Sequence, residues 1–293
     1  MDIETLRKAM AERDTFSTLE MLDVQTGERK ALREFDFVIE APNWTRDGRF
    51  LVYNSRGRIY RFELANGKIE ELHSGFAVDC NNDHVLSPDN RQIAVSHFTN
   101  ADVTSRVYIL PFAGGDPVLV TEKGPSYLHG WSPDGQTLAY CAERGGQYDI
   151  YTIPVQGGAE TQLTDLPGLD DGPEYAPDGK QIWFNSTRTG LMQVWRMGPD
   201  GSNPVHVTDE NANCWFPHVS PDGNWVVYVV YTKGDVAPGD HPANKNVEIH
   251  LLPARGGEPK TLVKLFGGQG TMNVNSWSPD SRMIAFVSYR LKS

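Results

Sequence analysis

Cysteine is scarce in this sequence, with only Cys80, Cys141 and Cys214 among 293 residues. The number is odd, the spacings are wide, and no Cys-x-x-Cys pair occurs. These features indicate neither a disulfide framework nor a thiolate metal site. We therefore expect three buried thiols that pack as small hydrophobic side chains.

Long apolar runs and an excess of positive charge are also missing. No run approaches the roughly 18 apolar residues of a membrane-spanning helix, and residues 1–8 lack the apolar core of a secretory signal. The 27 Lys and Arg residues against 38 Asp and Glu give a net charge of −11, which argues against a basic face for nucleic acid or anionic membranes. We expect no membrane insertion, no nucleic-acid partner and a cytoplasmic location, or a periplasmic one if an export signal has been removed.

A helical pattern is confined to the start of the chain. Asp2 can cap a helix in which Ile3, Leu6 and Met10 lie on one stripe. Residues 1–15 are therefore expected to form a leader helix or a disordered segment. Residues 16–293 alternate strand-like runs with turns rich in Gly and Pro, and we expect them to form one domain.

A short turn motif occurs six times. Its fullest form is Trp131-Ser-Pro-Asp-Gly135, followed by a strand-like run over residues 137–142. Proline presets the first turn position, Asp can bond its own backbone, and Gly or Asn tolerates the positive φ of a tight reversal. Each copy therefore predicts a hairpin turn, in which the Asp and the leading aromatic residue serve the turn and the packing. The six copies are Trp44–Gly48, Leu86–Asn90, Trp131–Gly135, Tyr175–Gly179, Val219–Gly223 and Trp277–Ser281.

The spacing of these motifs predicts the architecture. Steps of 42, 45, 44, 44 and 58 residues separate the turn aspartates, and such periods are typical of four-stranded propeller blades. The 13 residues after Asp280 and the 31 residues from Ser17 to Asp47 together make one more repeat of 44. We predict an all-β, six-bladed β-propeller with four-stranded blades, whose last blade is closed by the N-terminal strands. Closure removes the free sheet edges, and a monomer is expected.

The longest step contains an insertion. Residues 232–246 are polar, contain Gly and Pro, and separate the second and third strands expected in the fifth blade. This connection lies on the face where the chain enters each first strand, so the insertion is expected to reach over the mouth of the central channel. Its His241 and Lys245 are candidate ligand-binding residues, and Asp170 and Asp171 lie in the entering loop of the fourth blade.

The repeat resembles that of the TolB family. The resemblance rests on the Trp-Ser-Pro-Asp-Gly core, the Asp149-Ile-Tyr strand, and the Gly157-Gly158 turn with its Leu163-Thr164 ending. It covers the chain from about residue 16 to residue 293 and implies the fold more specifically than the function. Similar repeats occur in prolyl-oligopeptidase-type peptidases and oligogalacturonate lyases, but the Gly-x-Ser-x-Gly elbow of a peptidase is missing from this sequence.

Polar residues that differ between repeats precede the turn motifs. First strands line the channel of a propeller, so these side chains are expected to converge near its mouth and bind a ligand. Three histidines among them, His84, His129 and His218, are a credible ligand set for zinc or manganese. However, the residues lie either five or four positions before the turn aspartate, an offset that reverses the side-chain face unless a bulge intervenes. The first group is His84, His129 and Asn275, and the second is Asn43, Glu174 and His218.

Basic residues occur near the connections between second and third strands. In so acidic a chain, a ring of them at the mouth would attract an anionic small molecule or oligosaccharide, or an acidic protein tail. A scaffold role is the alternative. The candidates are Arg56, Arg144, Arg188 and Lys245, with Lys233 and Arg290 beside them.

Two functions are compatible with these features. Because no catalytic motif is present and propellers most often bind other molecules, we favour a ligand- or protein-binding module that uses the channel mouth and needs no cofactor. The alternative is a metal-dependent carbohydrate-active enzyme similar to oligogalacturonate lyases. In that case His84, His129 and His218 would hold the metal, and basic residues would neutralise a uronate of an acidic oligosaccharide.

Overall fold

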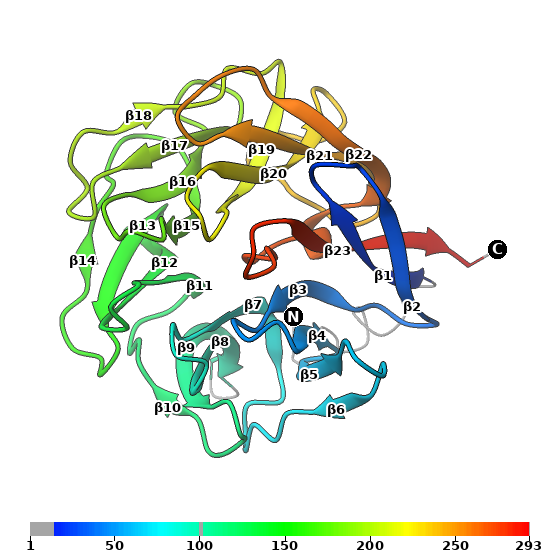
Figure 1. Ribbon diagram of the computed structural model, residues 1–293. Helices are drawn as coiled ribbons and strands as arrows, with labels where there is room; N and C mark the ends of the chain where they lie inside the picture. The colour runs from blue at the N-terminus through cyan, green and yellow to red at the C-terminus, as the bar shows by residue number, and fades with distance from the viewer. Residues whose placement is uncertain (1–14, 100–101, 293) are drawn as a thin grey trace.

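Six β-sheets arranged in a ring form the protein (Figure 1). The computed structural model describes residues 15–99 and 102–292, so the leader segment expected for residues 1–15 lies, except for Thr15, outside the described residues. In the part of the chain that is described, no helix has the length and apolar character to cross a membrane. The elements are β1 (Thr15–Asp23), β2 (Arg29–Phe35), β3 (Glu40–Trp44), β4 (Phe50–Ser55), β5 (Arg58–Glu63), β6 (Ile69–Glu71), β7 (Cys80–Leu86), β8 (Gln92–Thr99), β9 (Thr104–Pro111), β10 (Val118–Leu119), β11 (Ser126–Trp131), β12 (Thr137–Arg144), β13 (Gln147–Pro154), β14 (Thr161–Gln162), β15 (Asp170–Tyr175), β16 (Ile182–Ser186), β17 (Gln193–Met197), β18 (Val205–His206), β19 (Ala212–Val219), β20 (Trp225–Thr232), β21 (Lys245–Pro253), β22 (Lys260–Gly267), the 3-10 turn η1 (Gln269–Thr271) and β23 (Met283–Leu291).

Five of the blades are antiparallel sheets of four strands, β3–β6, β7–β10, β11–β14, β15–β18 and β19–β22, which we number one to five. The sixth blade contains β23, β1 and β2, and its innermost strand is reduced to a bridge between Trp277 and Ile284. The chain before it forms the 3-10 turn η1. The six-bladed propeller predicted from the repeats is confirmed.

The ring is closed by strands from both ends of the chain. β1 pairs with β23 along its whole length, from Thr15 opposite Leu291 to Asp23 opposite Met283. β2 pairs with the other side of β1. The predicted closure of the last blade by N-terminal strands is therefore confirmed, and it leaves neither β1 nor β23 as an unpaired edge.

The six turn motifs owe their shape to hydroxyl and carboxylate groups. The Ser132 hydroxyl donates to Asp134 Oδ1 at 2.6 Å, and the Gln136 amide donates to the same oxygen at 3.0 Å. Four other copies use Thr45, Ser87, Ser220 or Ser278 in the same way. In the remaining copy Ala176 has no hydroxyl, and the Lys180 amide still donates to Asp178 Oδ1. The aspartates therefore have the turn role expected from the sequence.

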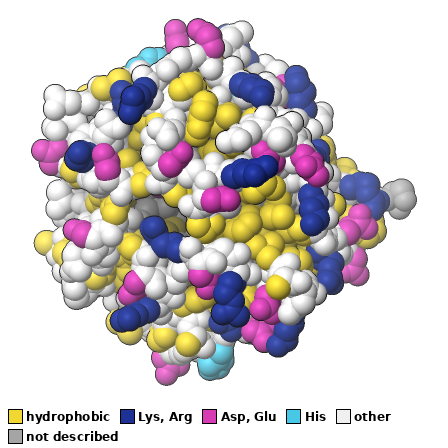
Figure 2. All heavy atoms as spheres, viewed as in Figure 1, with side chains coloured by type: hydrophobic (Ala, Val, Ile, Leu, Met, Phe, Trp, Pro, Cys, Tyr) yellow, Lys and Arg dark blue, Asp and Glu magenta, His cyan; other side chains and the backbone are white. Residues whose placement is uncertain are grey.

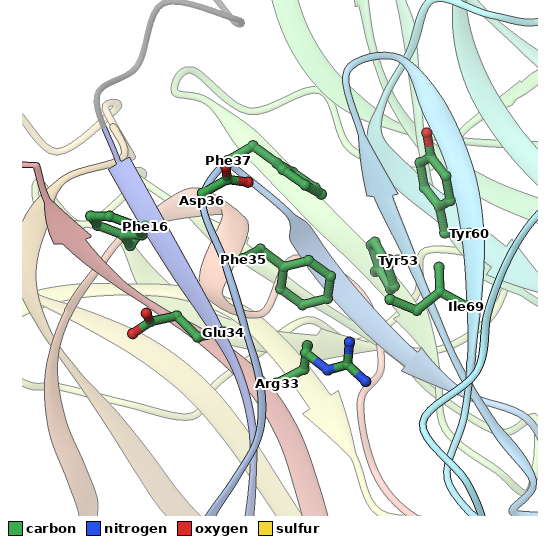
Figure 3. A pocket seen from close by; sticks show the side chains of 9 residues that line it. All are labelled: Phe16, Arg33, Glu34, Phe35, Asp36, Phe37, Tyr53, Tyr60 and Ile69. Atoms are coloured by element: carbon green, nitrogen blue, oxygen red, sulfur yellow. The ribbon is translucent and has the colours of Figure 1, made fainter.

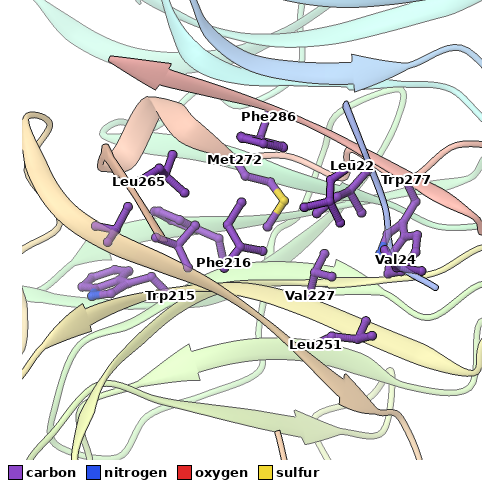
Figure 4. Close-up of a cluster of buried hydrophobic side chains, with 14 of the residues drawn as sticks. Leu22, Val24, Trp215, Phe216, Val227, Leu251, Leu265, Met272, Trp277 and Phe286 are labelled. Carbon is purple, nitrogen blue, oxygen red and sulfur yellow. The ribbon is translucent and has the colours of Figure 1, made fainter. Parts of the chain in front are cut away.

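Hydrophobic clusters between neighbouring blades form the core. A large cluster joins the fifth and sixth blades and includes Trp215, Phe216, Met272, Trp277 and Phe286 (Figure 4). The three cysteines are buried and unpaired, as expected. Since the blades pack face to face around the whole ring, each depends on its two neighbours for burial.

The seam between the sixth and first blades is aromatic. Phe35 at the end of β2 lies 5.4 Å from Phe37 and 5.7 Å from Tyr53, measured between ring centroids. Tyr53 in turn stacks on Tyr60 at 5.5 Å. Figure 3 shows these rings beside a surface hollow of about 470 Å³. These aromatic rings pack the sixth blade, which closes the ring, against the first blade.

The first strands of blades one to five all contain a β-bulge, seen as a shift in pairing register. Ala41, Gly172 and Phe216 have positive φ at these bulges, 56°, 61° and 57°. At Gly172 an added Cβ would lie 2.6 Å from Asn185 Oδ1, so this position requires glycine. Because a bulge changes which side chains face the channel, residues before and after it form two separate layers.

Candidate functional site

A pocket of about 460 Å³ lies at the end of the channel where the chain enters the first strands. We call it the mouth pocket. Its walls come from the starts of β7, β11 and β15, the end of β8, the insertion and η1. Carboxylates of Glu40, Asp83 and Asp171 line it, and none of the described lining residues is Lys or Arg. Its aromatic walls are Phe98, Tyr127, Tyr148 and Phe216.

His129 lies between two of these carboxylates. Its Nε2 is 3.2 Å from Asp171 Oδ1 and 4.0 Å from Asp83 Oδ1, and its ring stacks on Phe216 at 5.9 Å. Burial disfavours the charged imidazole, but the two carboxylates outweigh burial and raise the pKa of His129 to about 9. Burial likewise opposes ionisation of Asp171, yet His129 and the Gly172 amide, which donates to Oδ1 at 2.7 Å, lower the pKa of that carboxyl.

Asp83 is held by side-chain amides from two blades. Asn81 Nδ2 donates to its Oδ2 at 2.6 Å, and Asn273 Nδ2 donates to its Oδ1 at 2.6 Å. Burial raises the pKa of Asp83, and the charge of Asp171 adds to that effect, while His129 opposes it. At neutral pH the site therefore pairs the His129 imidazolium with the Asp171 carboxylate, and the carboxyl group of Asp83 lies on the other side of the ring.

The insertion reaches this pocket through His241. Its Nε2 lies 3.9 Å from Asp171 Oδ2, and its ring centroid lies 4.3 Å from Trp215 and 5.3 Å from Phe216. Burial lowers the pKa of His241 despite the opposing charge of Asp171. The insertion thus lies over the mouth as expected, whereas a role of His241 in binding stays a prediction.

Because His129 is protonated in the folded protein, we expect its contribution to the free energy of unfolding to fall as the pH rises. Because the pKa of His129 is raised from 6.5 to about 9 on folding, its contribution is complete below pH 6.5 and is lost as the pH rises to 9. We expect His129→Gln to remove up to about 3 kcal/mol of unfolding free energy at pH 6 and much less at pH 9.5. Urea unfolding of both proteins across this range measures the difference, and a constant difference would contradict the assignment.

A second cluster lies on the other side of the bulges. Glu174 Oε2 lies within hydrogen-bond distance of His218 Nδ1, at 2.7 Å. Glu174 Oε1 accepts the Asn275 side-chain amide at 2.7 Å and the Val219 backbone amide at 2.9 Å. Asn43 Nδ2 donates to the carbonyl of Asn275. Four of the six polar residues selected from the sequence therefore meet in one buried network that joins blades four, five, six and one.

A pocket at the opposite end of the channel, of about 560 Å³, borders this network. Its walls combine prolines and aromatic residues of the repeat, among them Trp44, Trp131, Tyr175 and Trp277, with four of the polar residues that differ between repeats, Asn43, His129, Glu174 and Asn275. The mouth pocket differs from it in being walled also by the insertion, through His241, and by η1, through Gln269.

The three histidines selected as metal ligands do not come together. His84 is fully buried against the first blade, with Nε2 3.4 Å from the carbonyl of Val52, and burial lowers its pKa to about 4. His218 has its second ring nitrogen 3.3 Å from the carbonyl of Met272. His129 belongs to the mouth pocket. The described residues contain no group of three His, Cys, Asp or Glu side chains that could hold a metal ion, so these histidines do not fit a shared zinc or manganese.

Two of the basic candidates are bound in ion pairs. Arg144 Nη2 lies 2.9 Å from Glu160 Oε2, and Arg188 Nη2 lies 2.6 Å from Asp170 Oδ2. The Arg144 and Arg188 side chains are 16% and 9% exposed. Each guanidinium therefore neutralises a carboxylate of its own surroundings.

The other basic candidates also lie away from the mouth pocket. The Arg56 guanidinium lies over the Phe37 ring at 4.9 Å, and Lys245 Nζ donates to the carbonyl of Asp235 at 3.2 Å. On the face shown in Figure 2, Lys and Arg side chains are interspersed with Asp and Glu. None of these basic candidates is among the described residues that line the mouth pocket, so a role for them in binding an anion stays a prediction.

Several lining residues were not selected from the sequence. Asp83 directly precedes His84, and Tyr127 lies two residues before His129. A search extended to the residues before each polar position would have found both. Asn273 and Tyr148 carry no such signal, because Asn273 reaches the pocket from the segment after η1 and Tyr148 from the third strand of the third blade, β13.

Comparison with known proteins gives matches along most of the chain. A model of the TolB beta propeller domain family matches residues 83–251. The uncharacterized protein Atu1656 of Agrobacterium fabrum is 45% identical over 274 residues, which are 93% of this chain and 92% of that protein. The Tol-Pal system protein TolB of Francisella tularensis is 27% identical over 230 residues, which are 74% of this chain and 52% of that TolB. The match therefore spans about half the length of that relative.

Solved structures give the same result. A structure from Agrobacterium tumefaciens, provisionally assigned as TolB, has a TM-score of 0.90 and 45% identity, covering 94% of this chain and 99% of that one. TolB from Acinetobacter baumannii has a TM-score of 0.65 at 19% identity, covering 82% and 61% of the two chains. An oligogalacturonate lyase in complex with manganese reaches 0.54 at 16% identity, covering 87% and 75%, a similarity of fold alone.

Proposed function

Because this chain belongs to the TolB β-propeller family, we propose that it is a binding module that holds a protein segment or a small ligand in its mouth pocket. The observation that carries the proposal is the pocket itself. Its volume of about 460 Å³ lies within the range of ligand sites. Buried polar side chains converge in it from several blades, and an insertion absent from the other blades lies over it.

The mouth pocket is favoured over the larger pocket at the other end of the channel. Function in a repeat fold depends on residues grafted onto the repeat. The mouth pocket has part of the insertion and of η1 in its wall, whereas the far-end pocket is walled in large part by the repeat's own Pro and aromatic residues. The Francisella relative is by name a protein of a Tol-Pal system, and membership of an assembly suits a binding role. The lyase alternative has less support, because the three histidines have separate partners and no described Lys or Arg lines the pocket.

Selection of peptides followed by occlusion of the pocket tests the proposal. A random-peptide library is panned against the immobilised protein, and the affinities of the enriched peptides are measured by fluorescence anisotropy. Gln269 lines the pocket from η1, so Gln269→Trp places a large ring in it. We expect this substitution to weaken the enriched peptides about tenfold or more, since buried contact surface is lost.

The matched control places the same ring elsewhere. Lys180 lies in the turn of the fourth blade with 82% of its side chain exposed, so Lys180→Trp should leave the affinities unchanged. Peptides that bind Gln269→Trp as tightly as the wild type would show that the mouth pocket is not the binding site. A library that yields no binder would contradict the protein-segment form of the proposal.

A further inference from the structure

Acidic side chains outnumber basic ones in the wall of the mouth pocket. Glu40, Asp83 and Asp171 line it, and the His129 imidazolium lies 3.2 Å from Asp171 and 4.0 Å from Asp83. Asp171 Oδ2 lies 3.9 Å from His241 Nε2, beyond hydrogen-bond distance. The described lining therefore has more acidic than basic side chains, and the Asp171 carboxylate is among its walls.

One buried acceptor has no donor. Asn273 lines the pocket and is 0% exposed, and its amide nitrogen is used on Asp83. Its Oδ1 has no hydrogen-bond partner among the described residues. A buried acceptor without a partner is costly, so a ligand that brings donors and no acceptors would remove that cost.

Aromatic rings complete the pocket. Tyr127 and Tyr148 have ring centroids 6.4 Å apart, and Phe98 and Phe216 contribute further walls. The faces of such rings attract a cation, by about 0.5–2 kcal/mol per contact when water is excluded. Rings beside carboxylates thus select for a positive group that carries apolar substituents.

We propose that the mouth pocket recognises a cationic nitrogen group, a primary ammonium or a guanidinium, by pairing it with Asp83 and Asp171 between the aromatic walls. Both groups carry donors and no acceptor, which is the complement of the lining. The proposal rests on the function proposed for the mouth pocket. It supplies the chemical class of ligand, which is opposite in charge to the anion expected from the basic residues.

Small probes that differ in charge test this specificity. Binding of phenethylamine, 2-phenylethanol and phenylacetate is measured by ligand-observed NMR titration. A capped Gly-Gly-Lys-Gly-Gly peptide and its twin with an acetylated lysine are measured alongside, since the group can come from a free amine or from a protein side chain. We expect each cationic probe to bind about tenfold or more tightly than its neutral or acidic twin. Tighter binding of phenethylamine than of the lysine peptide indicates that the ligand is a free amine, and the reverse order indicates a protein side chain.

Variants assign the effect to the pocket. Asp83→Asn and Asp171→Asn should each weaken phenethylamine about tenfold and leave 2-phenylethanol unchanged. The control Asp178→Asn changes a turn carboxylate whose side chain is 58% exposed, and it should alter neither. Thermal midpoints show whether each variant is folded. Asp171 is an ion-pair partner of His129, so its replacement could unfold the protein; in that case Asp83→Asn decides the result.

The outcomes separate this inference from the proposed function. Equal or tighter binding of the neutral or acidic twins, or no binding of any cationic probe, would overturn the cation specificity. Suppose that Gln269→Trp weakens the binding of the enriched peptides, but that these peptides need no Lys, Arg or free amino group. The mouth pocket then binds ligands, and only the cation specificity fails. If Gln269→Trp leaves the affinities of the peptides and of the cationic probes unchanged, both proposals fail.

Discussion

Replacing Glu174 with alanine is expected to destabilise the propeller by about 3–5 kcal/mol. The carboxylate is 7% exposed and is bound to His218, Asn275 and the Val219 amide. Alanine leaves His218 Nδ1 and the Val219 amide without this acceptor and leaves Asn275 Nδ2 only the Val219 carbonyl, and each buried group that loses its partner costs about 1–3 kcal/mol. Urea denaturation followed by tryptophan fluorescence gives the change in the free energy of unfolding.

Two further variants serve as comparisons for Glu174→Ala. Glu174→Gln keeps the volume and one oxygen, so its loss should be smaller than that of alanine. Glu258→Ala changes an exposed glutamate and should alter stability by less than about 0.5 kcal/mol. A loss below about 1 kcal/mol for Glu174→Ala would mean that the network does not hold the four blades together.

Removing β23 is expected to abolish cooperative folding. A chain ending at residue 282 lacks the strand that β1 pairs with from Thr15 to Asp23, and it exposes Leu19 and Leu22, which are 0% and 1% exposed in the closed ring. Both sides of the opened ring would then present unpaired backbone groups that favour aggregation. Circular dichroism and size-exclusion chromatography should show a chain without a sharp thermal transition and with a tendency to aggregate.

A shorter truncation is the control for this experiment. Removing only residues 292 and 293 leaves β23 intact and should preserve the thermal midpoint. A synthetic peptide of residues 283–291 added to the long truncation should restore part of the transition, because it can pair with β1. A chain ending at residue 282 that unfolds as sharply as the full chain would show that closure contributes little.

The architecture was predictable because the signals for it are local. Each hairpin turn is specified within five residues by Asp together with Pro, Gly or both, and the hydroxyl of Ser132 bonds a carboxylate two positions away. The spacing of these turns then gives the number of blades, and the leftover lengths at the two ends give the closure. The sixth blade departs only in its innermost strand, where η1 takes the place of regular pairing.

The candidate sites were harder to predict because they depend on contacts between distant residues. The bulges in the first strands decide that His129 joins Asp171, whereas Glu174 joins His218. The pattern of residue types does not show where such a bulge falls. Asn273 reaches Asp83 across 190 residues of sequence, and no spacing rule indicates that pair.

The basic residues illustrate the same difficulty. The ring expected at the mouth was inferred from the position of each residue in its repeat. Which carboxylate each guanidinium meets depends on the neighbouring strand, and Glu160 lies close enough to pair with Arg144. An ion pair within the blade neutralises the charge, so position alone did not determine the electrostatics of the mouth.

Closure of the ring also sets how the molecule would respond to force. Since β1 and β23 are antiparallel with Thr15 opposite Leu291, both strands leave the ladder at the same end. Tension applied between Thr15 and Leu291 would load the ladder one residue pair at a time, as in a zipper, instead of shearing all its hydrogen bonds at once. The strand pair that protects the sheet edges is therefore the place where a pull on both ends would open the propeller first.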